Sequence, residues 1–201
     1  PHALARAAEA AQDNPREADQ RMRRAAVGPQ DVVCAIADVE ISPFLQAALD
    51  YARFRSAAII LVICGQPMPS PSAEPLANVT IDLAPGPELI AGCTRPKAGT
   101  AIKLALEAVS SAAFVRLGKT YGGLMVDVRA TTPRGWQRAT RVVTRLTNLP
   151  VEEAAKLIKK AGGRAKVALV MHHARVNAAR AQTLLIQHKG LLRAIIGDVD
   201  L

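Results

Sequence analysis

Residues 32–64 decide the fold, and they read VVCAIADVEISPFLQAALDYARFRSAAIILVIC. Two unbroken apolar runs, residues 32–37 and 57–64, are rich in β-branched side chains and are typical of strands buried on both faces of a parallel sheet. Between these runs, Ser42 and Pro43 are typical of an N-cap and a first helical residue. The segment therefore predicts a strand, a helix and a second strand.

The rest of the chain extends this order. A third strand is predicted over residues 78–83, and the succession of strands and helices indicates an α/β domain with a parallel sheet. A long helix over residues 99–118 carries apolar residues around most of its circumference, which predicts a central helix packed on several sides, with a second subunit as a candidate neighbour. Further helices are predicted over residues 4–11, 15–26, 43–54, 133–146, 151–161, 164–174 and 177–188.

Positive charge is concentrated in the last third of the chain. The whole chain carries 26 Lys and Arg against 17 Asp and Glu, and residues 133–201 hold 13 of the former against four of the latter. This shift sets the predicted boundary between an α/β domain, residues 1–132, and a basic helical subdomain, residues 133–201. One face of the helix predicted over 133–146 carries Arg134, Arg138, Arg141 and Arg145. Because no exposed-looking aromatic residues accompany them, a solvated basic face is favoured, and we expect no nucleic-acid partner.

Composition bears on the compartment. Half of the 201 residues are hydrophobic, which is enough for a sizeable core, and the longest uninterrupted apolar run has eight residues, too few to cross a bilayer. No charged and then apolar leader opens the sequence, so we expect a cytoplasmic protein with no membrane partner. The histidines lack a third ligand at the spacing of a metal site, and we expect no cofactor. Reduced, buried thiols are predicted for Cys34, Cys64 and Cys93.

Two longer motifs carry a family resemblance. Residues 86–101 read GPELIAGCTRPKAGTA, and residues 116–131 read RLGKTYGGLMVDVRAT. They resemble the patterns G-P-E-x-x-x-G-S-T-R-x-K-A-G-T-A and G-K-x-x-G-N-L-M-V-D-V-x-A-T-N of the N-acetylmuramic acid 6-phosphate etherases. This family is grouped with the glucokinase regulatory proteins among the sugar-isomerase (SIS) domains. Weaker similarity extends over nearly the whole chain.

The resemblance implies the C-terminal part of a SIS-type α/β sheet followed by a small helical bundle. It also implies a cytoplasmic homodimer that binds a phosphosugar and cleaves the D-lactyl ether of N-acetylmuramate 6-phosphate, without metal or cofactor, in amino sugar metabolism and peptidoglycan recycling. The reaction eliminates D-lactate and then adds water, so it needs a base at C2 and an acid at the departing oxygen. The family's first third, with one catalytic glutamate, precedes the part that resembles this chain, and a separate chain that carries it would complete the fold.

The family motifs also supply candidate site residues. By resemblance, the substrate-binding candidates are Ser42, Glu88, Thr94, Arg95 and Lys97. Glu88, Arg95 and Lys97 are equally well explained as a polar network that stabilises a dimer, and Thr94 as a cap of the long helix. In the second motif, Asp127 is interpreted as a buried, hydrogen-bonded structural acid.

Two positions depart from the family pattern where chemistry is expected. Gln12 stands where the family has a catalytic acid in a G-A-E-D motif, and an amide does not exchange protons near neutral pH. The family's phosphate-binding turn, A-S-G-R-T-P, is replaced by residues 38–43, which read DVEISP. Asp38 and Glu40 would occupy the helix start and repel a phosphate dianion. We therefore assign no catalytic residue and expect an etherase relative whose catalysis is weak or lost, a pseudoenzyme.

Two further hypotheses belong to other functional classes. One is a non-catalytic module that senses a phosphosugar or controls a protein partner, comparable to the glucokinase regulatory proteins. The other is a nucleic-acid adaptor that uses the basic helices. Release of lactate from N-acetylmuramate 6-phosphate separates an etherase from both, and the salt dependence of duplex binding tests the adaptor.

Overall fold

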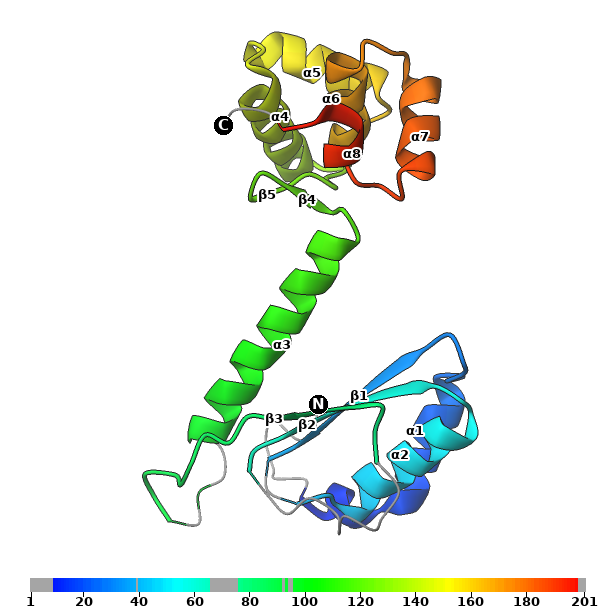
Figure 1. Ribbon diagram of the computed structural model, residues 1–201, viewed down its shortest axis with the longest axis vertical. Coiled ribbons are helices and arrows are strands. Elements are labelled where there is room, and N and C mark those ends of the chain that lie inside the picture. Colours follow the sequence, from blue (N-terminus) through cyan, green and yellow to red (C-terminus); the bar gives the residue numbers. More distant parts are fainter. Residues whose placement is uncertain (1–8, 39, 66–75, 92, 94–95, 199–201) are drawn as a thin grey trace. The chain divides into compact units, whose positions relative to one another are not determined.

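The computed structural model describes residues 9–38, 40–65, 76–91, 93 and 96–198 (Figure 1). By its internal contacts, the chain forms two compact units, one up to residue 107 and the other from residue 108 onward. Each unit has its own cluster of buried apolar residues. The boundary between the units falls inside the long helix, upstream of residue 132, where the charge balance changes.

The first unit contains the predicted α/β elements. A short 3-10 helix, η2 (Glu9–Asp13), comes first, and the rest of the predicted helix 4–11 lies outside the described residues. The strands run parallel in the order β1-β2-β3, so the predicted strand–helix–strand unit and the α/β class are confirmed. The elements that follow η2 are α1 (Pro15–Arg24), β1 (Val32–Ala37), α2 (Pro43–Phe54), β2 (Ala58–Ile63) and β3 (Val79–Asp82).

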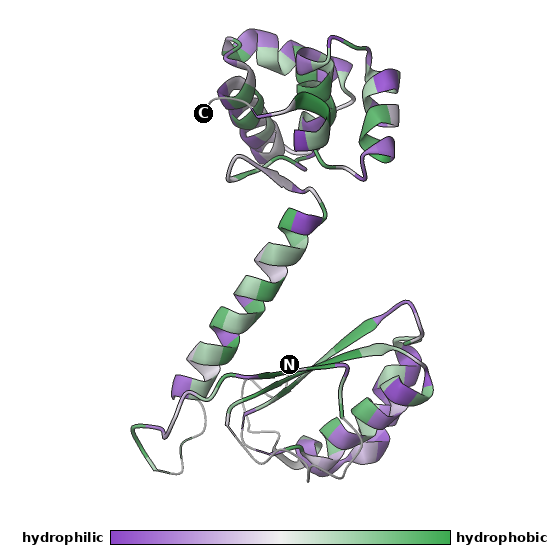
Figure 2. Cartoon of the chain, viewed as in Figure 1, coloured by the Kyte–Doolittle hydropathy of each residue, from purple (hydrophilic) through white to green (hydrophobic). Residues whose placement is uncertain are grey.

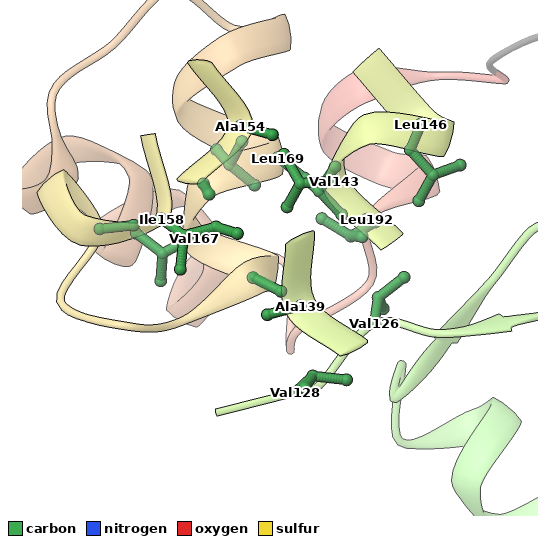
Figure 3. Packing of buried hydrophobic residues seen from close by; sticks show 14 of the residues in the cluster. Val126, Val128, Ala139, Val143, Leu146, Ala154, Ile158, Val167, Leu169 and Leu192 are labelled. Carbon is green, nitrogen blue, oxygen red and sulfur yellow. The ribbon is translucent and has the colours of Figure 1, made fainter. Parts of the chain in front are cut away.

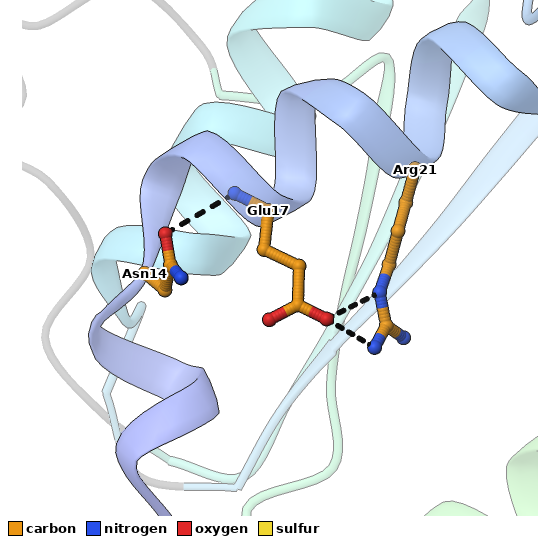
Figure 4. Close-up of polar contacts among 3 residues, drawn as sticks. All are labelled: Asn14, Glu17 and Arg21. Carbon is orange, nitrogen blue, oxygen red and sulfur yellow. Dashed lines mark hydrogen bonds and ion pairs between the residues drawn. The ribbon is translucent and has the colours of Figure 1, made fainter.

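Local sequence explains where α1 and α2 begin. The Asn14 side chain accepts a hydrogen bond from the backbone N–H of Glu17 at 3.2 Å, and the Ser42 hydroxyl accepts one from Leu45 at the same distance. Each cap is followed by a proline, which loses nothing in the first helical turn. On α1, Arg21 Nε donates to Glu17 Oε1 at 3.0 Å one turn away (Figure 4). Both helix starts follow the sequence prediction.

The core of the first unit lies between the sheet and these two helices. α1 and α2 lie on the same side of the sheet (Figure 1). Small side chains of the helices meet the inward residues of β1 and β2, which keeps the layers close. The buried cluster includes Ala35, Ala37, Leu49, Ala52, Ile59, Leu61 and Ile63.

The prediction that β1 is buried on both faces is wrong. Ala35 and Ala37 are buried, whereas Val32 is 61% exposed and Ile36 is 41% exposed. Cys34 is exposed as well, so the prediction of a buried thiol is wrong at this position. Successive side chains of a strand point to opposite faces, and α1 and α2 pack on the face of Ala35 alone. The outward face of β1 is therefore open.

The long predicted helix is α3 (Pro96–Arg116), and its sides are exposed. Within this fully described helix, Ala98 is the single buried residue, while Leu104 is 58% exposed and Val115 is 56% exposed. Figure 2 shows hydrophobic residues along most of the length of α3. The prediction of a helix packed on several sides therefore does not hold within one chain.

By length and composition, α3 could also span a bilayer, and 6% of its most apolar 18-residue window is buried. The expectation of no membrane partner rested on uninterrupted apolar runs, which do not identify this predicted helix as a candidate span. Single helices of this kind are also found in soluble proteins, so the finding is weak evidence for a membrane.

After the last part of α3, the second unit continues with a hairpin and then with helices. Its core includes Val126 and Val128, which follow the hairpin, and Ala139, Ile158 and Leu169 from three helices (Figure 3). Four predicted helices are confirmed as α4 to α7, whereas the hairpin and α8 are not predicted, because such short elements leave no periodicity. The bounds are β4 (Thr120–Tyr121), β5 (Leu124–Met125), α4 (Pro133–Thr147), α5 (Val151–Lys160), α6 (Ala165–His173), α7 (Ala178–Gln187) and α8 (Arg193–Ile196).

The interpretation of Asp127 as a buried acid is wrong. Its neighbours Val126 and Val128 are buried, whereas the Asp127 side chain is 43% exposed and forms an ion pair with Lys119 at 3.0 Å. Alternate residues of an extended segment point in opposite directions, so the two valines enter the core and the aspartate faces away from it. Asp127 does have the expected hydrogen-bond partner, but at the surface.

Candidate functional site

The carboxyl ends of the three strands meet at one edge of the sheet, which is where open α/β sheets bind their ligands. Asp38 follows β1, Cys64 follows β2, and Ala84 lies just beyond β3. They line a cavity of about 410 Å³, a volume within the range of small-molecule sites. Among the described residues, the lining consists of Asp38, Cys64, Gly65, Ala84, Pro85, Gly86, Pro87, Glu88, Cys93 and Ala98.

The Glu88 carboxylate lies at the N-terminus of α3. Its Oε1 accepts hydrogen bonds from the backbone N–H groups of Lys97 and Ala98, both at 3.0 Å, and its Oε2 accepts one from Lys97 at 2.9 Å. The free N–H groups and the dipole of a helix N-terminus normally attract anions. Here a carboxylate of the protein itself takes that place.

The Lys97 side chain folds back on the same loop. Its Nζ donates a hydrogen bond to the backbone oxygen of Pro87 at 2.8 Å. Gly86 has a φ of +76°, a conformation that glycine adopts without strain, and a Cβ there would come within 3.7 Å of Lys97 Nζ. Glu88 and Lys97 thus brace one loop against the start of α3. Thr94 and Arg95 lie outside the described residues.

Asp82, at the end of β3, ties neighbouring loops together. Its Oδ1 accepts hydrogen bonds from the backbone N–H groups of Gly65, at 2.9 Å, and of Ala84, at 3.0 Å. Both donors belong to residues that line the cavity. The bonds fix the two chain segments that leave β2 and β3 and place another carboxylate at this edge of the sheet.

Several carboxylates lie near the Cys64 thiol at the cavity. Burial raises the pKa of the Cys64 thiol, and the nearby carboxylates of Asp38, Asp82 and Glu88 raise it further. The thiol Sγ lies 3.9 Å from the backbone oxygen of Ala98, to which it donates a weak hydrogen bond. A protonated thiol is a poor nucleophile. Cys64 therefore responds to the field of the site but is not equipped for nucleophilic catalysis near neutral pH.

The turn between β1 and α2 carries the two predicted carboxylates. Asp38 is half-buried and lines the cavity, while Glu40 is exposed. Ser42 does not line the cavity, and its hydroxyl is engaged with Leu45 as the cap of α2. Of the predicted substrate-binding residues that the structure describes, the cavity thus includes Glu88, but not Ser42 or Lys97.

Gln12, at the position of the family's catalytic acid, lies away from this lining. Its side chain is exposed on η2, and it is not among the residues that surround the cavity. An exposed amide offers hydrogen bonds but no proton transfer. Among the described residues, no general acid stands at this position.

The histidines of the second unit have structural contacts. His173 Nε2 is 2.9 Å from the backbone oxygen of Leu146, and the His172 ring meets the His173 ring edge-on with 5.0 Å between centroids. Burial lowers the pKa of His172, and the charges of His173 and Arg175 lower it further. Within the described ranges, no group of three or more His, Cys, Asp or Glu residues is arranged to hold a metal ion.

Sequence reasoning missed Cys64, Asp82 and Cys93 as parts of this site. A usable signal existed for the first two, because Cys64 follows β2 and Asp82 ends β3 at the same edge of the sheet. Cys93 stands where the family motif has a serine, so its position in the signature could also have marked it.

Comparison with curated proteins follows the two motifs. No family model matches the chain. The chain is 38% identical over 194 residues to the N-acetylmuramic acid 6-phosphate etherase of Crocosphaera subtropica. The alignment covers 96% of this chain and 63% of that protein. It is 41% identical over 191 residues to the protein of the same name from Synechocystis. That alignment covers 95% of this chain and 62% of the relative. A third, from Edwardsiella ictaluri, is 36% identical over 196 residues, with 98% and 64% covered.

These matches confirm the resemblance that the two motifs predict, over nearly the whole of this chain. The chain spans less than two thirds of the length of the curated relatives that it matches.

Proposed function

We propose that this chain, a homologue of the N-acetylmuramic acid 6-phosphate etherases, has kept a SIS-type sugar-binding scaffold but has weak or no lactyl-ether cleavage. The homology supports an amino sugar or its phosphate ester as ligand and a role in peptidoglycan recycling, and we propose in addition that the protein is a cytoplasmic homodimer. The observation that carries the proposal of impaired catalysis is the negative charge around the candidate cavity.

A sugar phosphate would bring a dianion to the edge of the sheet where carboxylates already lie. Asp38 lines the cavity in the turn that replaces the family's phosphate-binding motif, whereas Glu88 is common to this chain and the family pattern. Two like charges 4 Å apart cost about 1 kcal/mol in water and more when they are partly buried. The Lys97 ammonium keeps its charge when it donates to Pro87, but Lys97 is not among the described residues that line the cavity. These contacts support poor binding of a phosphate group in the family's usual position.

The loss of an acid supports the same proposal. Elimination of lactate needs proton transfer at both C2 and the departing oxygen. Gln12 replaces one acid of the family, and its exposed amide cannot transfer a proton near neutral pH. A ligand could therefore bind without turnover, which also favours the second candidate function, a sensing module without catalysis.

The central experiment measures lactate release and phosphosugar binding on the same protein. We expect the wild-type chain to release D-lactate from N-acetylmuramate 6-phosphate far more slowly than the Synechocystis relative. In isothermal titration, D38A/E40G should bind the phosphosugar about fivefold more tightly than the wild type, because the repulsion of about 1 kcal/mol from Asp38, which lines the cavity, is removed. This variant should remain slow in catalysis, since Gln12 is unchanged.

The matched control is D50N/E107Q, which removes two negative charges from α2 and α3 at positions that do not line the cavity. Its affinity should stay within about threefold of the wild type, because the charges are exposed and screened. Lactate release at the rate of the relative would contradict the proposal. So would equal gains in affinity for both double variants.

The same assay distinguishes the remaining roles. Binding without lactate release would support the sensing module. If the missing third of the family is supplied by a separate chain, lactate release should rise when a polypeptide with that sequence from the Synechocystis relative is added. A rise to the rate of the relative itself would contradict the assignment of Gln12 as a lost acid.

A further inference from the structure

A row of four arginines runs along one face of α4: Arg134, Arg138, Arg141 and Arg145. Residues spaced by four, three and four lie above one another on a helix, and at 1.5 Å per residue the row extends for about 16 Å. All four side chains are exposed. None forms an ion pair with a carboxylate of the residues that the structure describes.

The arginines of α1 differ in this respect. Arg21 and Arg23 are each paired one turn away, with Glu17 and Asp19 (Figure 4 shows the first pair). α4 contains no acidic residue at all, so each arginine of its row has another arginine three or four positions away. Like charges at these spacings destabilise a helix. An external polyanion would remove this repulsion.

The inner side of α4 holds the row in place. Ala139, Val143 and Leu146 are buried in the core of the second unit (Figure 3), and the Thr132 hydroxyl caps the helix by accepting from Gly135 at 3.1 Å. The outer face is therefore a fixed, straight surface. It also lies in a strongly basic unit, since residues 108–201 contain 16 Lys and Arg against five Asp and Glu.

The composition of this face discriminates among possible anionic partners. Protein interfaces are anchored by buried apolar or aromatic side chains, and membrane-surface helices insert an apolar face. No large apolar side chain of the fully described α4 is exposed, and Trp136 packs against the core. Binding of single strands needs aromatic rings for stacking, which this face also lacks. An even row of guanidinium groups instead suits a regular array of phosphates.

We propose that the arginine row of α4 binds the phosphate backbone of double-stranded nucleic acid without reading its sequence. The face has the charge and spacing for backbone contacts but no arrangement for base readout in the described residues. From the sequence no nucleic-acid partner is expected, because the basic row lacks exposed aromatic residues. That absence argues against single strands and leaves duplex backbone contacts open.

The test is fluorescence anisotropy with a 20-base-pair DNA duplex and an RNA duplex of the same sequence, titrated with the full chain at several salt concentrations. Four phosphate contacts should give a slope of about −3.6 in a plot of log K against log salt concentration. Each arginine removed should reduce the slope by about one. R138Q/R141Q should therefore bind roughly 50-fold more weakly in 0.1 M salt.

Two further variants separate the row from general charge and from misfolding. R180Q/K189Q removes two exposed charges on and just after α7, which packs on α6, and should keep the slope. R138K/R141K retains the charge, so it should keep the salt slope of the wild type and lose less affinity than R138Q/R141Q. All variants should show the helical circular dichroism of the wild type.

The proposal is overturned if the wild type binds neither duplex in 50 mM salt. It is equally overturned if R180Q/K189Q loses as much affinity as R138Q/R141Q. Binding to phosphatidylserine vesicles or to poly-glutamate, with no binding to either duplex, would assign the row to another class of partner and would also overturn it. A preference between the DNA and RNA duplexes identifies the natural source of the phosphates.

Discussion

Cys64 allows the field of the candidate cavity to be measured without any ligand. Burial and the carboxylates of Asp38, Asp82 and Glu88 raise the pKa of its thiol. The thiolate should therefore appear at a higher pH than in an ordinary cysteine, and alkylation by iodoacetamide should be slow at pH 8. The measurement is the alkylation rate against pH in a C34S/C93S background.

Removing one carboxylate should shift this profile. D38N should lower the pKa of Cys64 and speed its alkylation, whereas D50N, on the exposed part of α2, should leave the profile unchanged. A midpoint no higher than that of a free cysteine thiol would contradict the negative potential on which the proposed loss of phosphate binding depends.

Glu88 has a second role that is separate from any ligand. Because its carboxylate accepts the first N–H groups of α3, E88A should reduce the free energy of unfolding by about 1 kcal/mol, the typical effect of losing a helix cap. Urea denaturation measures this change. E107Q on the same helix removes an exposed carboxylate paired only with Lys103 and should cost less than about 0.5 kcal/mol.

This comparison decides between the interpretations of the family signature. If E88A and E107Q have equal effects on stability, Glu88 is not a helix cap in solution. A contact of Glu88 with substrate or with a second subunit is then the favoured interpretation. The same interpretation would then apply to Lys97, because its backbone N–H and its Nζ are both hydrogen-bonded to this loop.

At the scale of elements, α3 is the part of the chain that most needs a neighbour. Leu104 and Val115 are more than half exposed, and Val109 is 42% exposed. We expect the proposed homodimer to bury this helix, so that L104S/V115S weakens the dimer about 100-fold, from two lost burials of about 1.5 kcal/mol each. Sedimentation equilibrium measures the dimer constant.

A control on the polar side of the same helix is available. K103Q/E107Q replaces the exposed ion pair of α3 and should leave the dimer constant unchanged. A wild-type chain that stays monomeric at 100 µM, or a dimer that survives L104S/V115S, would show that another surface or another partner covers α3.

The elements also show where sequence reasoning succeeds. β1, α2 and β2 were predictable because Ser42 and Pro43 mark a helix start and long apolar runs flank it. The hairpin at Thr120–Tyr121 was not, since two residues carry no periodicity. Exposure was harder still: an apolar run predicts a strand, but which of its faces is covered depends on residues far away in the sequence.

At the scale of the whole molecule, the two units defined by internal contacts also differ in net charge. Residues 1–107 contain 10 Lys and Arg and 12 Asp and Glu, whereas residues 108–201 contain 16 and five. The composition was readable from the sequence, whereas the packing of residues 117–132 was not, because they resemble part of the α/β domain by motif. In the structure Val126 and Val128 belong to the helical core.

The candidate site was only partly predictable for a similar reason. Motif positions identified Glu88 and Asp38, and the structure adds Cys64, which reaches the same cavity from β2. Three segments distant in sequence contribute to that cavity, and only the parallel register of the strands brings them to one edge. Resemblance to the etherases indicates which sequence positions are candidates for the site, whereas the structure shows which of these residues line the same cavity.

The open side of β1 has a practical consequence for anyone who purifies this protein. Val32, Cys34 and Ile36 face outward next to one another on alternate positions of a strand at the rim of the sheet. Threonine or lysine at these places would leave Ala35 and Ala37 undisturbed beneath them, because they share no packing surface. The solubility of the isolated polypeptide can therefore be raised by substitutions on the exposed side of this one strand, while the buried side of the strand is left unchanged.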